Sequence, residues 1–296
     1  MNSFISVIIP VYKNINLLND SLKSLLDQTY KFFEVIVVND GSSEKKKIFE
    51  IIKKFKKKKL DIKFINIKKN KGVSCALNKG INKSKGKYIS WLSHDDFFHP
   101  KKFEKQINFM KKKKIDVCFT NFYLVNNQKK ILKKINYKNI FFESKKHILI
   151  RDNINLCTAI INKKIYKKIG CFDLQKKHTQ DYDLLIKIFR SYKIYFINDN
   201  LFYSRVHKKQ SSIIGKEEAN KEKEKLFLEN FIFIKKIYFN SNLLKKIYIV
   251  FFLRIRNLNL INVKLDQFIK SHNIFFTLIL KTIFKAGGIY LSIKNN

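Results

Sequence analysis

Short apolar segments alternate with amphipathic segments through the first half of the chain. The apolar segments are five to seven residues long and rich in Ile and Val, which predicts buried strands rather than helices. The expected strands are residues 5–9, 34–38, 62–67, 88–92 and 116–122. Between them, apolar residues recur at helical spacing, which predicts helices that cover the sheet. These helices are expected after Asn14 or Asn16, either of which can cap the first one, over residues 48–55 and 73–82, and after Pro100.

Alternation of strand and helix predicts an α/β fold with a doubly wound, mostly parallel sheet. Ligands bind beyond the carboxyl ends of the strands in such sheets. Polar clusters follow four of the predicted strands, namely Tyr12 with Asn14, Asp40, Asn70 with Lys71, and residues 94–96. The sequence therefore predicts a binding site at this edge of the sheet.

The remainder of the chain divides into two parts. Residues 123–215 show less regular patterns, among which we predict a helix over 181–191 and a strand over 201–207. From residue 216 a charged run leads into aromatic and aliphatic clusters interrupted by Lys and Arg. We expect a catalytic domain over 1–215 and a basic, amphipathic, helical C-terminal appendage over 216–296. The appendage fits either an interfacial membrane anchor or helices that pack on the domain or on a second subunit.

The formal net charge is +39, from 62 Lys and Arg against 23 Asp and Glu. One explanation is a polyanionic partner, such as nucleic acid or an anionic membrane surface. The other is codon drift in an AT-rich genome, since Lys, Asn, Ile and Phe are all abundant. The four cysteines form no C-x-x-C pair, which argues against structural zinc and favours free thiols in a reducing compartment. No signal peptide and no apolar run long enough to span a bilayer is recognisable.

Five segments, in order, resemble the inverting family 2 glycosyltransferases of the GT-A fold. They are S-V-I-I-P-V-Y from Ser6, V-V-N-D-G-S from Val37, N-K-G-V-S-C-A-L-N-K-G from Asn70, W-L-S-H-D-D from Trp91 and T-Q-D-Y-D-L-L-I-K from Thr179. The resemblance covers about residues 4 to 210. It implies transfer of a sugar from a nucleoside diphosphate donor, which we expect to be UDP-linked.

The resemblance places the nucleotide sugar on the loops after the first four strands. It implies that Pro10 and Tyr12 lie against the base and that Asp40 accepts a hydrogen bond from the base imide. Asn70 and Lys71 follow the third strand and would lie near the donor. Many family members have Arg where this chain has Leu77, so Lys71 or Lys79 would have to replace that phosphate partner. From the residues alone, Asp40 or Ser42 can instead cap the following helix.

Residues 93–95 occupy the position of the family's D-x-D metal motif, with Ser93 in place of the first carboxylate. The resemblance implies that Asp95 holds Mn²⁺ or Mg²⁺ against the diphosphate, and that His207 touches the metal or the diphosphate. Asp96 would position the sugar, or cap the helix near Pro100. His207 also fits a structural role, in which case Arg205 and Lys208 would serve the phosphates.

Asp181 is the general base that the resemblance implies, with Gln180 in place of the first acid of the family's pair. A carboxylate suits this role because the acceptor hydroxyl must lose a proton as it attacks the anomeric carbon. The alternative is an acidic residue that interacts with the helix dipole.

The resemblance to this family also implies a glycan or lipid-linked acceptor in the synthesis of bacterial cell-surface polysaccharide or lipopolysaccharide. It further implies a cytoplasmic enzyme at the inner face of the membrane. Two other functions stay open. A nucleic-acid-binding protein would explain the charge, although the lysines are spread along the whole chain and we expect no specific nucleic acid. A nucleotidyltransferase would use a related scaffold. Dinucleotide oxidoreductases and P-loop kinases are disfavoured, because neither G-x-G-x-x-G after the first strand nor G-x-x-x-x-G-K-[ST] is present.

Overall fold

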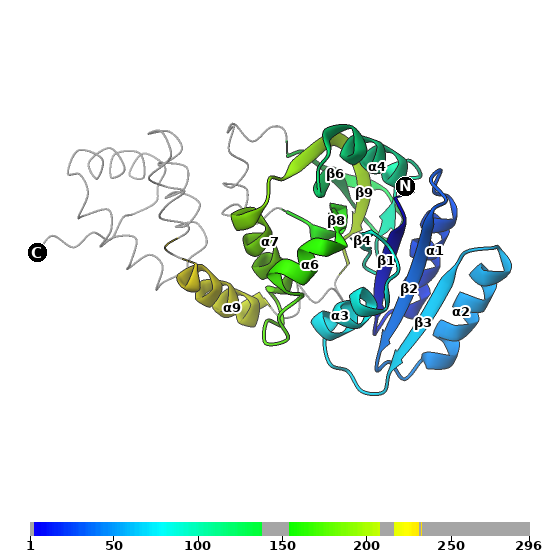
Figure 1. The fold of residues 1–296 in the computed structure, drawn as a ribbon. Coiled ribbons are helices and arrows are strands. Elements are labelled where there is room, and N and C mark those ends of the chain that lie inside the picture. The colour runs from blue at the N-terminus through cyan, green and yellow to red at the C-terminus, as the bar shows by residue number, and fades with distance from the viewer. Residues whose placement is uncertain (1–2, 138–153, 208–215, 231, 233–296) are drawn as a thin grey trace, which may run out of the picture. The chain divides into compact units, whose positions relative to one another are not determined.

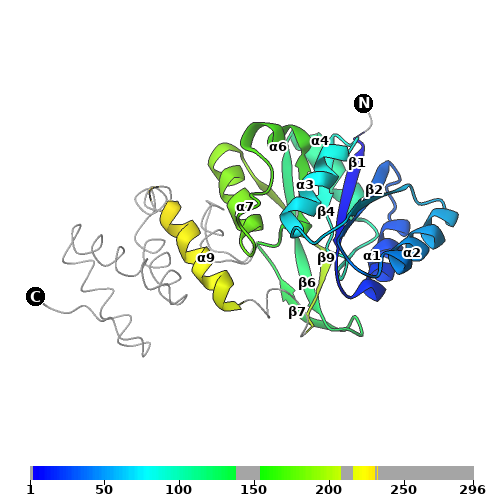
Figure 2. The same cartoon turned by 90° about the horizontal axis from the view of Figure 1, so that it is seen from below.

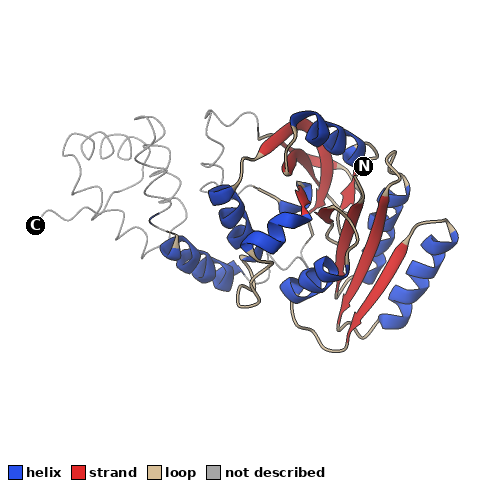
Figure 3. Cartoon of the chain, viewed as in Figure 1, coloured by secondary structure: helices blue, strands red, loops and turns tan. Residues whose placement is uncertain are grey.

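A computed structural model describes residues 3–137, 154–207, 216–230 and 232, and Figure 1 shows their arrangement. The described residues up to Lys216 belong to one compact unit, and Glu217 to Glu229 belong to a second. In the first unit, strands form a single sheet with helices packed around it (Figure 3).

The N-terminal part of the sheet is parallel and doubly wound. Its strands are β1 (Ile5–Val11), β2 (Phe33–Asp40), β3 (Ile62–Ile67) and β4 (Tyr88–Trp91), in the spatial order β3-β2-β1-β4. Helices α1 (Leu18–Leu26) and α2 (Lys45–Lys57) lie on one side of these strands and α3 (Val73–Lys83) on the other (Figure 2). Right-handed crossovers require this, since the chain moves outward from β1 to β3 and then returns to β4.

The second part of the sheet mixes strand directions. β8 (Ile160–Asn162) is antiparallel to β4 and to β6 (Val117–Val125), and β9 (Tyr195–Arg205) runs parallel to β6. β5 (Phe97–Phe98) pairs with β9, and β7 (Ile131–Ile135) pairs with β6. The helices here are α4 (Lys102–Lys113), α6 (Lys163–Ile169) and α7 (Gln180–Ser191), and a short 3₁₀ turn at Leu156–Thr158 precedes β8. Another 3₁₀ turn, at Ile15–Leu17, lies between β1 and α1. This mixed, mostly parallel α/β sheet confirms the predicted fold class.

The core lies where the sequence is most apolar. Every residue of β1 and β2 is buried, because helices cover both faces of the central strands. Leu18, Leu22 and Leu25 form the buried side of α1. All four cysteines are free thiols, with Cys118 and Cys157 buried in the second part of the sheet.

Several predicted boundaries were wrong. β6 extends three residues beyond the predicted 122, and β9 begins at Tyr195 rather than 201 and ends at Arg205. Asn14 makes no side-chain capping bond, because a left-handed residue (φ 55°) followed by a 3₁₀ turn leads into α1. β8 and α6 were not predicted, since three and seven residues are too few to show a period.

The second unit is described only through α9 (Lys216–Glu229) and the residues that follow to position 232. α9 contains the predicted charged run, and Leu226 and Phe227 in its last turn are buried. The predicted apolar clusters at 247–253 and 274–280 lie outside the described residues. Among the helices that the structure describes, none is long and apolar enough to cross a membrane.

Candidate active site

The end of β2 packs tightly against the loop that precedes α3. Gly41 adopts φ +76°, and a Cβ there would lie 2.2 Å from the backbone nitrogen of Asn70. The close approach lets the Lys71 N–H donate to Asp40 Oδ1 at 2.9 Å. Burial raises the pKa of Asp40, and the N–H groups of Lys71 and Gly72 oppose that shift.

Asp40 and Ser42 therefore have separate tasks. The Ser42 hydroxyl accepts the Glu44 N–H at 3.2 Å just before α2, whereas Asp40 bonds across to the α3 loop. The capping role considered for Asp40 was wrong, because it is Ser42 that bonds a backbone N–H just before α2. The side chain of Asp40 is 97% buried, so its carboxylate is held in one place.

The end of β1 brings Tyr12 beside Asp40. Val11 is paired with Asn39 in the parallel register, so Tyr12 and Asp40 leave the sheet side by side. Tyr12 is 39% exposed, with the Lys13 ammonium 5.3 Å from its ring centroid. Pro10 differs from Tyr12, because it lies buried within β1. Asn70 and Lys71 are both exposed.

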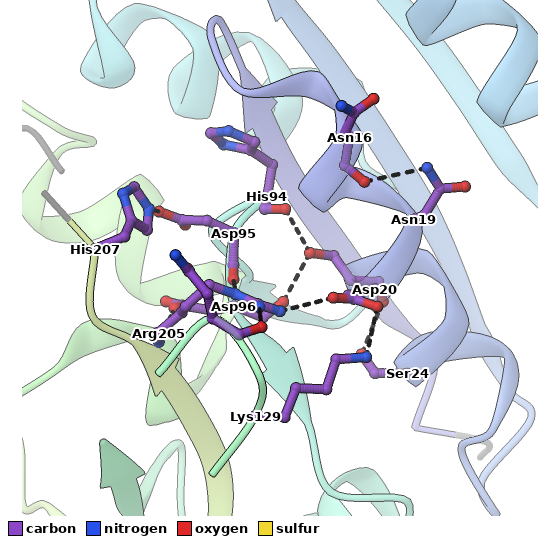
Figure 4. A network of polar contacts seen from close by, with 12 residues as sticks. Asn16, Asn19, Asp20, Ser24, His94, Asp95, Asp96, Lys129, Arg205 and His207 are labelled. Atoms are coloured by element: carbon purple, nitrogen blue, oxygen red, sulfur yellow. Dashed lines mark hydrogen bonds and ion pairs between the residues drawn. The ribbon is translucent and has the colours of Figure 1, made fainter. Parts of the chain in front are cut away.

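Residues 93–96 form a turn after β4, called the metal-motif turn below. The Asp96 N–H closes it by donating to Ser93 O at 3.1 Å. Asp95 Oδ2 lies 3.0 Å from His207 Nε2, just beyond the end of β9 (Figure 4). The next carboxylate points elsewhere, since Asp96 Oδ1 accepts the backbone N–H of Arg205 at 2.8 Å. Burial, and next to it the charge of Asp95, raise the pKa of Asp96 well above its usual range.

Helix capping does not explain Asp95 or Asp96. β5 separates both residues from α4, which begins only at Lys102 and has Lys101 at its N-cap. The suggestion that Asp96 caps the helix near Pro100 was therefore wrong. The physical reason is the antiparallel pairing of Phe97 and Phe98 with β9, which carries the chain away from the turn in an extended form.

Asp181 lies in the first turn of α7, where its Oδ1 accepts the Tyr182 N–H at 2.9 Å. Asp181 follows a loop that contacts α3, where the Ser74 hydroxyl donates to Lys176 O at 3.4 Å. Burial raises the pKa of the Cys157 thiol well above its usual range, and the charges of Asp96, Asp95 and Asp181 raise it further.

The loop before α7 is fastened to α3 by a residue whose contribution the sequence did not reveal. Asn78 Nδ2 donates to Phe172 O at 2.8 Å, and Asn78 Oδ1 accepts the Phe172 N–H at 3.0 Å. The Phe172 ring also packs edge-on against Trp91 of β4. The available signal was an amide side chain in the middle of an amphipathic helix, where polar groups with a tertiary partner are sometimes found.

Arg205 does not serve the phosphates as considered above. It is 1% exposed, and its guanidinium nitrogens donate to Asp95 O, Asn127 O and Asp20 Oδ2 at 2.7–2.8 Å (Figure 4). Lys208, the other residue considered for the phosphates, lies outside the described residues. Asp183, on the same helix turn as Asp181, is 92% buried and pairs with Lys187 at 2.6 Å.

The donor atoms at Asp95 and His207 suit a divalent cation. A carboxylate oxygen and a neutral imidazole nitrogen are both common metal ligands, and here they face each other at 3.0 Å. No group of three or more His, Cys, Asp or Glu side chains that could hold a metal occurs within the described part of the chain. The two residues fit a site that is completed by oxygens of a bound diphosphate and by water.

Comparison with known proteins shows the family to which the chain belongs. The model of glycosyl transferase family 2 matches residues 6–170, which span the parallel sheet, the metal-motif turn and the strand that pairs with β4. The chain belongs to glycosyl transferase family 2. This glycosyltransferase is 40% identical over 214 residues to an uncharacterized glycosyltransferase of Rickettsia bellii, covering 70% of this chain and 30% of the relative. Matches to the Rickettsia relatives extend over 30% to 65% of their length.

A second relative carries a more specific name. The Escherichia coli UDP-Glc:alpha-D-GlcNAc-diphosphoundecaprenol beta-1,3-glucosyltransferase WfgD is 28% identical over 220 residues, covering 74% of this chain and 81% of that protein.

Solved structures show the same GT-A type fold. S. aureus TarS 1-349 in complex with UDP-GlcNAc matches with a TM-score of 0.62 at 20% identity, over 76% of this chain and 66% of that chain. A mannosyltransferase from Pyrobaculum calidifontis, solved with GDP-Man and Mn²⁺, matches with a TM-score of 0.57 at 12% identity, over 80% and 65% of the two chains.

Proposed function

We propose that this glycosyltransferase moves a sugar, with inversion, from a UDP-linked donor to a glycan or lipid-linked acceptor in bacterial cell-surface polysaccharide synthesis. One observation carries the proposal. Asp95 meets His207 at 3.0 Å on the turn after β4, and the loop before α7, the helix that carries Asp181, packs on Trp91 of β4 through Phe172.

The nucleotide end of the donor would lie over the ends of β1 and β2. Tyr12 offers a partly exposed aromatic face for a flat base, and Asp40 beside it is a fixed hydrogen-bond acceptor for an imide N–H. Pro10 is buried, so its contribution would be to shape the end of β1. Exposed Asn70 and Lys71 border Asp40, and Lys71 would supply positive charge near the phosphates.

Asp95 and His207 would hold Mn²⁺ or Mg²⁺ together with the donor diphosphate. When bound, the cation would neutralise charge on the leaving diphosphate. Asp96 is bonded to the Arg205 backbone and is buried, so it would act on the sugar only through its effect on the shape of the turn.

Asp181 would act as the general base. The oxygen of the acceptor hydroxyl forms a bond to the anomeric carbon while its proton passes to the Asp181 carboxylate. The bond from the anomeric carbon to the diphosphate breaks, and nucleoside diphosphate leaves. Attack from the face opposite the leaving group inverts the anomeric centre.

The acceptor and the place of action rest on resemblance. The name of the Escherichia coli relative specifies a diphosphoundecaprenol-linked acceptor, and TarS was solved with UDP-GlcNAc. These relatives support a UDP-linked donor and a lipid-linked acceptor here. A chain of net charge +39 would be attracted to an anionic membrane surface, which agrees with action at the cytoplasmic face of the membrane.

Asp181→Asn tests the assignment, and Asp183→Asn is its matched control on the same first turn of α7. We expect Asp181→Asn to lower kcat about 10²- to 10⁴-fold with unchanged UDP affinity, because only the proton acceptor is lost. If Asp181 served only the helix dipole, both variants would lower the melting temperature and neither would lose turnover selectively. Wild-type turnover in Asp181→Asn would refute the proposed base.

Product analysis separates the proposal from the nucleotidyltransferase alternative. Incubation with UDP-glucose and candidate acceptors should release UDP, and NMR of the product should show the anomeric configuration opposite to that of the donor. Formation of UTP and glucose 1-phosphate from UDP-glucose and added pyrophosphate would instead support nucleotidyl transfer. Melting-temperature shifts with UDP, UDP-sugars and GDP-mannose, with and without Mn²⁺, identify the nucleotide, since a ligand that binds only the folded state raises that temperature.

A further inference from the structure

Two buried side chains donate hydrogen bonds to the backbone carbonyls of the metal-motif turn. The Ser21 hydroxyl of α1 lies 2.8 Å from His94 O and 2.7 Å from Asp96 O, between which it shares its single hydrogen. The Asp95 carbonyl, between those two, accepts from Arg205 Nε at 2.8 Å. Three consecutive carbonyls of the turn are thus bonded by Ser21, which is fully buried, and by Arg205, which is 1% exposed.

Arg205 is itself fixed on every side. Its other two guanidinium nitrogens donate to Asn127 O at 2.8 Å and to Asp20 Oδ2 at 2.7 Å, and its backbone N–H donates to Asp96 Oδ1 (Figure 4). The planar guanidinium has a rigid set of donors, so these bonds fix its orientation as well as its position. The turn is therefore joined to α1, to β9 and to the β6–β7 connection by a single side chain.

The same strand end also carries His207. Arg205 and His207 lie two residues apart, and each contacts Asp95, the former at its backbone oxygen and the latter at its carboxylate. The distance between the two proposed cation ligands therefore depends on the position of Asp95 relative to the end of β9. Arg205 sets that position through its bond to the Asp95 carbonyl.

We propose that Ser21 and Arg205 are positioning residues that hold Asp95 and His207 at the separation a divalent cation requires. This inference rests on the proposed function, in which those two residues bind the cation. The physical reason is preorganisation, because two ligands that are already in place lose little freedom when the metal binds. Residues that orient metal ligands typically affect metal affinity about 10- to 100-fold when mutated.

A purely structural role for Arg205 is the competing explanation. Arg205 lies between the carboxylates of Asp20 and Asp96, so its charge alone would stabilise the fold. Ser21 separates the two explanations, because Ser21→Ala removes hydrogen bonds to the turn and changes no charge. Arg205→Lys complements it, since this variant keeps the charge but loses the fork of donors.

The experiment measures Mn²⁺ binding to the full chain in the presence of saturating UDP, by the loss of the electron paramagnetic resonance signal of free Mn²⁺. Variants are Ser21→Ala and Arg205→Lys. Their controls are Ser84→Ala, a buried serine whose hydroxyl donates to Ile81 O at the end of α3, and Lys105→Met, which removes the cation of an exposed ion pair. UDP binding is measured separately by calorimetry.

We expect the Kd for Mn²⁺ to rise roughly tenfold or more in Ser21→Ala and in Arg205→Lys, and to stay at the wild-type value in both controls. A Kd for Mn²⁺ within about twofold of wild type in Ser21→Ala would overturn the inference, even if its melting temperature fell. If Arg205→Lys does not fold, Ser21→Ala decides alone. Failure of the wild-type chain to bind UDP would count against the proposed function, whereas UDP binding with unaltered Mn²⁺ affinity in the variants would count against the positioning role.

Discussion

Lys102 is a fully buried lysine whose charge should make the stability of this enzyme depend on pH. It lies in α4 with 0% exposure, and its ammonium is 4.3 Å from the ring centroid of Phe98 and 5.6 Å from that of Phe103. Within the described residues, Lys102 Nζ has no hydrogen-bond partner. Burial lowers the pKa of Lys102 to about 7, because the rings replace only part of the hydration that the ammonium loses.

The sign of the effect follows from proton binding. In the unfolded chain a lysine has a pKa of about 10.4, so between about pH 7 and about pH 10 the unfolded chain holds a proton that the folded chain has released. The free energy of unfolding therefore rises with pH in this window, by about 1.4 kcal/mol per pH unit. Over the window the rise is on the order of 5 kcal/mol, and below it the penalty is constant.

Urea unfolding of wild type and Lys102→Met across this pH range measures the effect. The variant should be more stable than wild type near neutral pH, and the difference should shrink toward zero as the pH approaches about 10, because neutral lysine is tolerated in the apolar site. Lys105→Met on the same helix is the control, since Lys105 is exposed and should give a small difference that does not vary with pH. A pH-independent difference for Lys102→Met, or a wild type more stable than this variant at neutral pH, would refute the reasoning.

Two further predictions concern the supports of the site. Gly41→Ala should lower the free energy of unfolding by about 2 kcal/mol and weaken UDP binding, because the new Cβ at φ +76° would clash with the backbone of Asn70. Chemical denaturation measures the first effect, and calorimetry with UDP measures the second. Asn78→Ala should lower the free energy of unfolding by about 1–3 kcal/mol, because it leaves the N–H and C=O of Phe172 without their partners. Ser74→Ala is the control and should lower it less, since this variant loses one long hydrogen bond of 3.4 Å. Equal losses in the two variants, measured by chemical denaturation, would argue against this role for Asn78.

The strands in the first half of the chain, and two of the candidate site residues, could be predicted from the sequence. β1 to β4 were placed to within a few residues, because short runs rich in Ile and Val are typical of strands, and every residue of β1 and β2 is buried. Asp40 and Asp95 could be singled out for a related reason. Polar residues directly after such strands lie at the carboxyl edge of a parallel sheet, whatever the details of the loops.

The second half was less predictable because its elements depend on partners that are distant in the sequence. β8 has three residues and exists as a strand because β4 and β6 pair with it from either side. Asp183 carries a charge that suggests exposure, yet packing of α7 buries it beside Lys187. Local pattern is uninformative in such cases, since the neighbours that decide burial are not neighbours in the chain.

The sequence by itself determined the class of fold, the edge of the sheet that carries the site, and the family, because apolar periodicity and short motifs are local properties. Only the tertiary structure decided that Ser21 and Arg205 form hydrogen bonds to the carbonyls of the turn after β4, and that the loop before α7 packs on β4 through Phe172 and Trp91. Ser21 and Arg205 are 184 positions apart. Nothing in the local sequence around a serine in a helix or an arginine in a strand indicates which distant residue it will bond to. Their hydrogen bonds exist only once the sheet has brought α1, the turn after β4 and the end of β9 together.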